Sequence, residues 1–279
     1  MTLLSLSLLV WLGSLLAGMV GALTGLGGGV VVVPLLALAF HVNLRYAAGA
    51  SLLSVIATSS GAAAAYVREG WSNVRLGMLL EVATTLGALA GASTAALVPT
   101  RAVAVIFGAL LLLAAAGSLR RPPTGPDVAG PPDRLAGVLR LGGTYPSPTG
   151  PVAYGVRRVP GGFALMLLAG WLSGLLGVGS GALKVTAMDD VMRVPFKVST
   201  TTSNFMIGVT AAASAGVYLA RGWVEPRLAA PVVLGVLPGA LLGARLLPRM
   251  RSRTLRAVFA VAVAALGWEM ILRGFTRRL

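Results

Sequence analysis

The sequence predicts an all-α polytopic membrane protein. We expect two homologous four-helix repeats, each with a Gly-rich broken helix and a half-helix, and about eight transmembrane helices in total. Three observations predict this class. Of the 279 residues, 56% are hydrophobic and only 11% are charged, whereas soluble domains are about 45 to 50% apolar even with glycine counted. Residues 1–40 carry no charged side chain, as in bilayer-spanning chains. The two halves of the sequence also resemble each other.

Composition excludes several functional classes. The net charge of +15 would suggest a nucleic-acid partner in a soluble chain, but these arginines lie between apolar segments and indicate membrane anchors instead. The absence of cysteine and the single histidine, His41, exclude thiol catalysis and metal sites that need two imidazoles. No Walker motif occurs, which argues against ATP hydrolysis. We therefore expect no cofactor, no metal and no nucleic-acid partner.

Apolar windows mark the expected elements in order. Most are close to the roughly 20 residues that a spanning helix needs: 3–23, 47–67, 76–98, 102–118, 161–178, 198–220, 228–248 and 254–272. The first window lacks the basic start of a signal peptide, so we interpret it as the first span. Two segments, 30–40 and Ala182–Val194, are shorter. Eleven helical residues cover about 16 Å, roughly half the hydrocarbon thickness, so we expect half-helices there.

An internal repeat organises the chain. A shift of 152 residues (170 − 18 = 152) aligns Gly18–Phe107 with Gly170–Phe259 without a gap. Trp, Tyr, Arg and Gly matches carry the most weight, because Ala/Leu-rich helices match by composition alone: Tyr66/Tyr218, Trp71/Trp223, Arg75/Arg227 and Gly25/Gly177. Duplication explains these pairs better than chance.

The repeat divides the chain into three parts. Residues 1–118 form the first transmembrane repeat, 119–160 a Pro/Gly-rich linker that we expect to be poorly ordered, and 161–279 the second repeat. Eight crossings with re-entrant half-helices would put the linker and both termini on one side. The positive-inside rule then favours a cytoplasmic linker. If each half-helix instead completes a crossing, the repeats are inverted and this count does not apply.

A glycine-rich break precedes each half-helix. The candidate substrate-binding residues here are Thr24, Gly25, Gly27, Gly28 and Gly29 in the first break, and Gly177, Gly179, Ser180 and Gly181 in the second. Dense glycines destabilise a helix by about 0.5 to 1 kcal/mol each. The following half-helix directs free N–H groups and a positive dipole end into the break, an arrangement that favours an anion.

Close helix packing is the alternative interpretation of these glycines. One motif alone would favour packing, but two motifs at matching positions, each followed by a short segment, favour a paired transporter site. Gly87, Gly91, Gly239 and Gly243 lie inside uninterrupted spans, and we assign them to packing.

A base and a polar helix start follow each half-helix: Arg45 and Ser51 in the first half, and Lys197, Thr201, Ser203 and Asn204 in the second. Arg45 and Lys197 align under the same shift, and paired cations would attract an anion. Interfacial snorkelling is the alternative for both bases. The polar residues either line a substrate pathway or cap and pack helices.

Several charged residues lack counterparts in the other half. Lys184 has no intrahelical partner, which leaves its charge for a ligand. Asp189 and Asp190 are candidates for proton coupling, although Arg193, four residues after Asp189, predicts a helical ion pair. Glu269 likewise precedes Arg273 by four residues. Glu81 has no such partner and is the better candidate for proton coupling.

These motifs resemble the sulfite exporter TauE/SafE family, also called the toluene sulfonate uptake permease group. The resemblance is carried by Gly25–Gly29 running to Pro34, by Ala47–Ser51, and by their second-half copies, Gly177–Val185 and Val194–Phe205. Ser180 stands where a third glycine is usual, and Thr186 where a proline is usual. The resemblance implies a secondary carrier of sulfite or organosulfonates across a bacterial or archaeal plasma membrane.

We therefore expect a multi-pass plasma (inner) membrane transporter, not an enzyme. It would bind a small anion at the breaks and move it by alternating access, with a proton as the candidate coupling ion. The sulfur in the substrate rests on the resemblance alone. Two alternatives stay open: a passive anion channel, and a membrane-embedded enzyme, for which a chain with one histidine and no cysteine offers few catalytic groups. The oligomeric state is not indicated.

Overall fold

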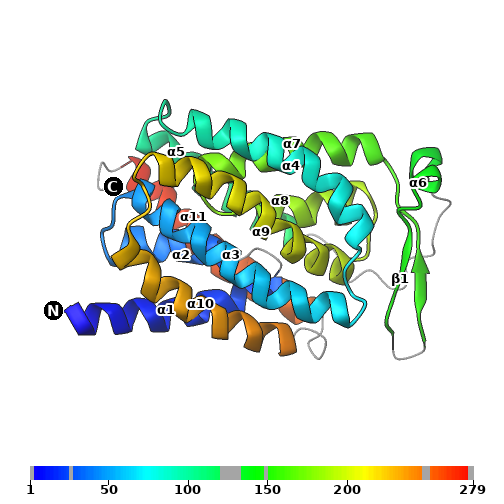
Figure 1. Cartoon of the computed structure of the whole chain (residues 1–279), viewed down its shortest axis with the longest axis horizontal. Coiled ribbons are helices and arrows are strands. Elements are labelled where there is room, and N and C mark those ends of the chain that lie inside the picture. Colours follow the sequence, from blue (N-terminus) through cyan, green and yellow to red (C-terminus); the bar gives the residue numbers. More distant parts are fainter. Residues whose placement is uncertain (1–2, 25–27, 120–132, 148–149, 247–251, 276–279) are drawn as a thin grey trace.

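The structure, a computed structural model, describes residues 3–24, 28–119, 133–147, 150–246 and 252–275 (Figure 1). It is a bundle of long helices with one small hairpin. The helices are α1 (Leu3–Thr24), α2 (Gly29–Pro34), α3 (Leu44–Arg68), α4 (Val74–Thr94), α5 (Thr100–Leu119), α6 (Arg134–Val138), α7 (Val159–Leu176), α8 (Gly181–Thr186), α9 (Phe196–Ala220), α10 (Pro226–Leu246) and α11 (Ser252–Phe275). The π-helical turns η1 (Leu35–Ala39) and η2 (Ala187–Val191) continue α2 and α8.

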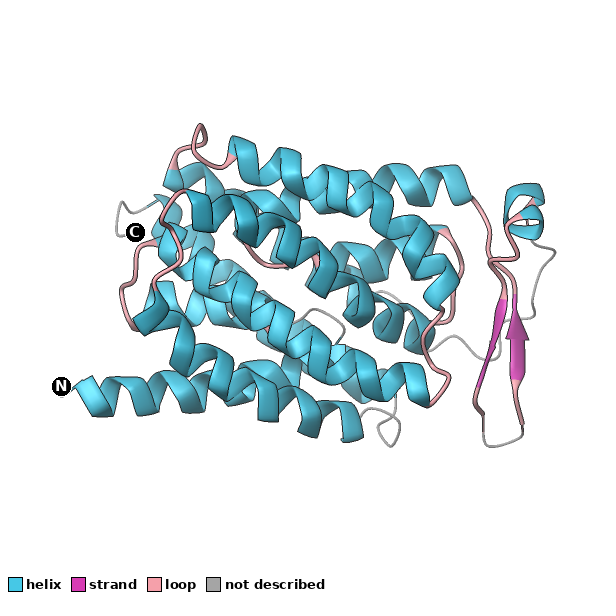
Figure 2. Cartoon of the chain, in the orientation of Figure 1, coloured by secondary structure: helices cyan, strands magenta, loops and turns pink. Residues whose placement is uncertain are grey.

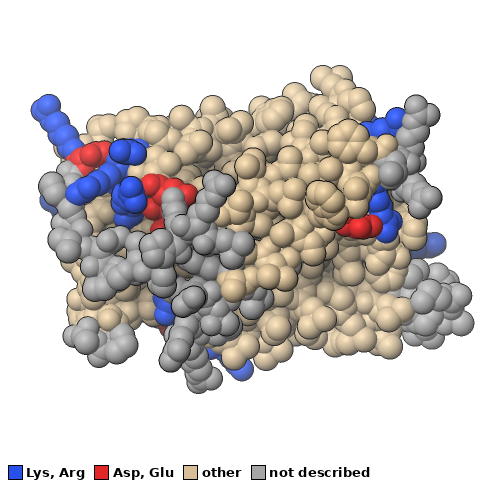
Figure 3. Space-filling model, turned by 180° about the vertical axis from the view of Figure 1, so that it is seen from behind, with Lys and Arg blue, Asp and Glu red and all other residues tan. Residues whose placement is uncertain are grey.

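The helices form a multi-pass membrane protein. Within the described residues, five are long and apolar enough to cross a bilayer: α3, α4, α7, α9 and α10. Leucines such as Leu86 and Leu234 stay exposed on their outer faces, where lipid can cover them. On the face shown in Figure 3, charged side chains gather at the two ends of the bundle and leave an uncharged band between them.

The two half-helices are confirmed as short segments, Gly29–Ala39 and Gly181–Val191. Pro34 lies at the junction of α2 and η1, where its ring is incompatible with a regular helix interior. The bounds of α2, η1, α3 and α4 recur 152 residues later (181 − 29 = 152) in α8, η2, α9 and α10. The two halves therefore contain the same succession of elements.

Glycines pack the helices of one half against those of the other. A Cβ on Gly239 or Gly243 would meet the carbonyl oxygen of Leu15 or Met19, so α10 lies parallel to α1 at backbone contact. In the same way a Cβ on Gly87 or Gly91 would meet the carbonyl oxygens of α7. The packing role predicted for these four glycines is confirmed, and the halves interlock.

Equivalent helices run in opposite directions. Arg45 at the start of α3 stacks on Trp223 just after α9, and Lys197 at the start of α9 stacks on Trp71 just after α3. Helices α3 and α9 are therefore antiparallel. The start of α1 and the end of α11 lie at one end of the bundle, and the hairpin in the described part of the linker lies at the other (Figure 1). This placement does not match the alternative with re-entrant half-helices, so the charge count for that alternative does not apply.

The linker is partly structured, so the expectation of an all-α chain with a poorly ordered linker is wrong for its described part. Strand β1 (Gly143–Tyr145) pairs antiparallel with β2 (Val152–Tyr154) beside α6 (Figure 2). Leu141, Tyr154 and Val156 are buried in one apolar cluster with Leu76 of α4. The Asn73 side chain donates to the Leu141 carbonyl and to the Tyr154 hydroxyl oxygen, both at 2.8 Å. Burial raises the pKa of Tyr154 to about 12, so this hydroxyl stays neutral.

Candidate substrate site

The second break is built from residues with left-handed backbone. Helix α7 ends at Leu176, and Gly177 (φ 71°), Gly179 (φ 76°) and Ser180 (φ 48°) separate it from α8. Glycine adopts these angles without steric cost, whereas a side chain at Ser180 is strained. In the first break, Gly25, Gly27 and the side chain of Thr24 lie outside the described residues, and the description resumes at Gly28.

The two breaks meet where α3 and α9 cross. A Cβ on Gly29 would lie 2.5 Å from both Ser51 Oγ and Val55 Cγ2, and 3.4 Å from Cα of Val178 in the other break. A Cβ on Gly179 would lie 2.6 Å from Ile207 and 3.0 Å from Val55. The starts of both half-helices therefore lie side by side in the interior.

Buried polar atoms that have no hydrogen-bond partner among the described residues surround this meeting point. They are Ser51 Oγ, Ser180 Oγ and Asn204 Oδ1, and each residue is buried. The Asn204 amide donates to the Ala22 carbonyl at 3.1 Å, and the Ser203 hydroxyl donates to the Gly181 carbonyl at 3.4 Å. An unsatisfied buried polar group costs about 1 to 3 kcal/mol. Serine hydroxyls in such a position are able to donate hydrogen bonds to an anion.

Thr201 lies away from the breaks. Its hydroxyl donates to the Trp71 carbonyl at 2.8 Å, which places it at the end of α9 that faces the linker. Of the predicted substrate-binding residues with described side chains, the structure brings Gly28, Gly29, Ser51, Gly177, Gly179, Ser180, Gly181, Ser203 and Asn204 to the two breaks and places Thr201 outside them.

Arg45 and Lys197 do not come together. Each cation stacks on the tryptophan of the other half, Arg45 on Trp223 at 5.0 Å and Lys197 on Trp71 at 5.2 Å. Because α3 and α9 are antiparallel, the two cations lie at opposite ends of the helix pair. The cations cannot act jointly on one anion at the breaks, but each can attract an anion to its own end.

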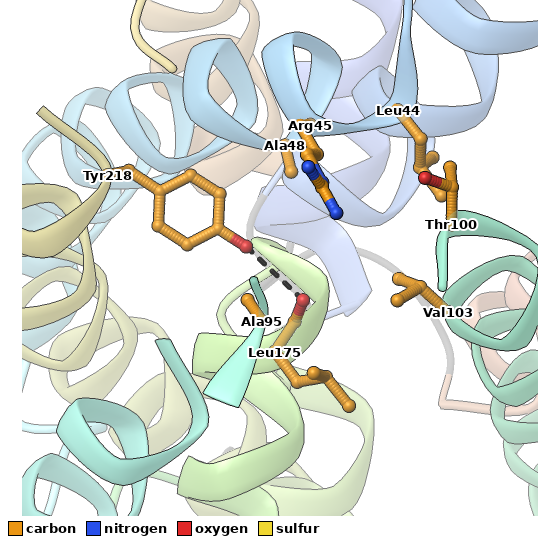
Figure 4. A pocket seen from close by; sticks show the side chains of 8 residues that line it. All are labelled: Leu44, Arg45, Ala48, Ala95, Thr100, Val103, Leu175 and Tyr218. Atoms are coloured by element: carbon orange, nitrogen blue, oxygen red, sulfur yellow. Dashed lines mark hydrogen bonds between the residues drawn. The ribbon is translucent and has the colours of Figure 1, made fainter. Parts of the chain in front are cut away.

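A small, partly open pocket lies at the Arg45 end, with a cavity volume of about 10 Å³, the space of about one water molecule (Figure 4). Its lining includes Arg45, Ala48, Thr100, Leu175 and Tyr218. Ala48, which lines this pocket, also packs against Gly177 of the second break. At the Lys197 end, Trp71 packs against Tyr145 of the linker hairpin, with ring centroids 6.1 Å apart. The two ends therefore differ: a small pocket lies at one and the linker hairpin packs at the other.

Two tyrosine hydroxyls donate hydrogen bonds to backbone carbonyls near the ends of α1 and α7, the helices that precede the breaks. The sequence analysis did not assign these tyrosines to the site. The Tyr66 hydroxyl donates to the Ala22 carbonyl at 3.1 Å, and the Tyr218 hydroxyl donates to the Gly174 carbonyl at 3.1 Å. Ala22 and Gly174 are equivalent positions (174 − 22 = 152), so the same capping bond occurs in both halves. The match of Tyr66 with Tyr218 in the internal repeat was the sequence feature that could have indicated this shared role.

Lys184 has an ionic partner, which overturns the expectation that its charge is free. Its Nζ lies 3.6 Å from Glu81 Oε2, and it donates a hydrogen bond to Thr210 Oγ1. The Thr210 hydroxyl donates to Glu81 Oε1 at 2.6 Å. Glu81, for which the sequence predicted no partner on its own helix, belongs to the same cluster. These contacts join α4, α8 and α9.

The other acidic residues singled out in the sequence are Glu269, Asp189 and Asp190, and their surroundings differ. Glu269 pairs with Arg273 at 2.9 Å, as predicted. Asp189 and Asp190 lie half-buried on η2, which ends at Val191. Arg193 follows that end with φ 59° and is exposed. The end of η2 interrupts the helical spacing on which the Asp189–Arg193 pair was predicted, and the pair stays a prediction.

Comparison with known proteins agrees with this geometry. The family model described as Sulfite exporter TauE/SafE matches residues 10–270. The chain belongs to the sulfite exporter TauE/SafE family. It is similar to the Probable membrane transporter protein YunE of Bacillus subtilis, with 29% identity over 96% of this chain and 97% of the relative. It is also similar to YdhB of the same organism, a probable membrane transporter, at 25% identity over 93% and 98%. A probable membrane transporter of Xylella fastidiosa shares 27% identity over 96% and 97%. No solved structure matches. These relatives are named as transporters, and none is named as an enzyme.

Proposed function

We propose that this protein is a secondary transporter that moves small anions, with sulfite or organosulfonates as the substrate class, across the plasma membrane by alternating access at the paired breaks. The observation that carries the proposal is the meeting of both breaks among buried hydroxyls that have no hydrogen-bond partner in the described part of the chain. Helix starts and hydroxyl donors favour an anion. Membership of the TauE/SafE family supports sulfur in the substrate.

We further propose that residues 1–118 and 161–279 are inverted repeats, and that the two repeats together contain about eight membrane helices. The matching element bounds and the antiparallel α3 and α9 support this organisation. A pseudo-two-fold axis in the membrane plane would exchange Arg45 with Lys197 and Trp71 with Trp223. Rocking of one half against the other would then open the breaks alternately to the Arg45 end and to the Lys197 end of the bundle.

We expect the linker end to be cytoplasmic. Described bases at that end are Arg68, Arg75, Arg134, Arg140, Arg157, Arg158, Arg193, Lys197 and Arg245, whereas the opposite end carries Arg45, Arg101, Arg221, Arg227 and Arg273. The positive-inside rule places the richer end inside. On this naturally cysteine-free chain, Glu225→Cys should react with an impermeant maleimide in intact cells. Thr144→Cys should react only after permeabilisation, and the reverse pattern would refute the assignment.

Ligand-dependent thermal stabilisation of the purified protein tests the proposed function. The ligands are sulfite, sulfoacetate, taurine, sulfate, thiosulfate, acetate and chloride. A ligand at 100 times its Kd adds about 2.7 kcal/mol of stability, so a sulfur oxyanion or sulfonate should raise the melting temperature selectively. Equal shifts with chloride would remove the reason to name sulfur.

The same assay tests the two end cations. Arg45→Ala and Lys197→Ala are each expected to weaken binding about twofold to fivefold, the size of an exposed charge interaction. The empty proteins should keep their melting temperature. Unchanged affinity in both variants would assign these bases to interfacial anchoring on Trp223 and Trp71.

A further inference from the structure

A buried ion pair lies one helical turn beyond the second break. Lys184 is on α8, three residues after its first residue Gly181, and its side chain is fully buried. Glu81 on α4 is 7% exposed. Ionised groups inside a membrane protein are costly and usually serve a function. The equivalent of Lys184 in the first half is Val32, so packing of the half-helix does not itself require a lysine.

The two carboxylate oxygens of Glu81 differ. Oε1 accepts hydrogen bonds from Thr210 at 2.6 Å and Thr85 at 3.1 Å. Oε2 is buried, accepts no hydrogen bond from a described residue, and faces Lys184 Nζ at 3.6 Å. That distance is longer than a charge-assisted hydrogen bond. A proton can therefore bind at Oε2 without breaking a hydrogen bond of the described structure.

Few other charges act on this pair. Helix α7, which packs on α4, has no charged residue between Val159 and Leu176. Helix α9 contributes Lys197 at its start and Tyr218 near its end, α5 contributes Arg101, and η2 contributes Asp189 and Asp190. Helix α4 itself carries Arg75 in its first turn. Thr84, Thr85 and Thr210 supply the polar surroundings, so the charge of Lys184 is balanced at close range by Glu81.

We propose that Glu81 and Lys184 couple anion binding to a proton. One O–H bond forms at Glu81 Oε2, the ion pair is lost, and the charge of Lys184 becomes available to an anion at the second break. Proton and anion then load together with no net change in charge, which lowers the cost of carrying the anion through the bilayer. Release of the anion restores the ion pair and expels the proton. This inference rests on the proposed function and adds its coupling ion.

Proton uptake on anion binding tests the coupling. Methanesulfonate and sulfoacetate are the probes, because both stay ionised over the range used. They are added to purified protein in weakly buffered detergent with a pH indicator. Wild type should take up about one proton per bound anion, and its affinity should fall about tenfold per pH unit wherever Glu81 is ionised in the free protein.

Variants separate coupling from folding. Glu81→Gln keeps an oxygen for Thr210 and Thr85 and should bind the anion with no proton uptake and no pH dependence. Glu269→Gln, which removes the ion pair with Arg273, should behave as wild type. Lys184→Met alone would leave the buried Glu81 carboxylate without its ionic partner and could unfold the protein. The double variant Glu81→Gln/Lys184→Met avoids this unpaired charge. It should fold but bind no anion, because it lacks the lysine charge.

The outcomes are distinguishable. An anion that binds wild type without proton uptake overturns the coupling and leaves the transporter standing. Uptake that persists in Glu81→Gln also overturns the assignment to Glu81. If neither probe nor sulfite changes the melting temperature of wild type at any pH, the proposed function fails, and the coupling fails with it.

Discussion

Replacing Gly174 by alanine is expected to lower the free energy of unfolding by about 3 kcal/mol, the upper end of the range for overpacking. A Cβ at this position would overlap the Ala88 carbonyl oxygen and lie 2.6 Å from the Ala92 nitrogen. Both are backbone atoms of α4 and cannot rotate away. Helices α4 and α7 would have to separate, and the Tyr218 bond to the Gly174 carbonyl would be strained. Thermal unfolding in detergent measures the effect.

Gly216→Ala is the matched control. Gly216 lies inside α9, and a Cβ there would meet nothing within 4 Å. Alanine is a better helix former than glycine by about 1 kcal/mol, so this variant should melt at the same temperature as wild type or higher. Equal melting temperatures for Gly174→Ala and Gly216→Ala would refute backbone contact between α4 and α7.

Removing the two serine hydroxyls at the breaks is expected to weaken anion binding by about a hundredfold or more. A hydrogen bond to a charged group contributes about 1.5 to 3 kcal/mol, and two would be lost. The double variant is Ser51→Ala with Ser180→Gly, because glycine tolerates φ 48° at position 180. The empty protein should be as stable as wild type or more stable, since neither hydroxyl has a hydrogen-bond partner in the structure. Ligand-induced melting shifts measure both quantities.

Ser14→Ala provides the comparison for this variant. Ser14 is another buried serine whose hydroxyl has no partner, but it lies on α1 against Gly235 of α10. Its removal should leave anion affinity unchanged. If Ser14→Ala weakens binding as much as the break variant does, the hydroxyls at the breaks do not contact the anion.

Local patterns predicted the elements well. The short apolar segments gave half-helices within a few residues of Gly29–Ala39 and Gly181–Val191, and four-residue spacing predicted the Glu269–Arg273 pair. These features depend on neighbouring residues within one helix. The same spacing rule assumes a continuous helix, and it does not extend to Asp189 and Arg193 because η2 ends between them.

Contacts between distant elements could not be predicted in this way. Glu81 and Lys184 lie on helices from different halves, and only their packing brings the two side chains together. The opposite placement of Arg45 and Lys197 follows from the antiparallel α3 and α9, a choice the sequence left open. Proline and glycine content predicted a poorly ordered linker, but a few apolar side chains such as Leu141 and Val156 suffice to dock its described part on α4.

Counterflow in proteoliposomes tests the central claim most directly. Vesicles containing the protein are preloaded with an unlabelled sulfonate that stabilises it, and labelled sulfonate is added outside. A carrier that alternates access exchanges one for the other, so the label should accumulate transiently above its outside concentration, and initial uptake should saturate. The Ser51→Ala/Ser180→Gly variant should lose this overshoot. Uptake that rises linearly with concentration and never exceeds equilibrium would contradict alternating access and indicate a passive channel.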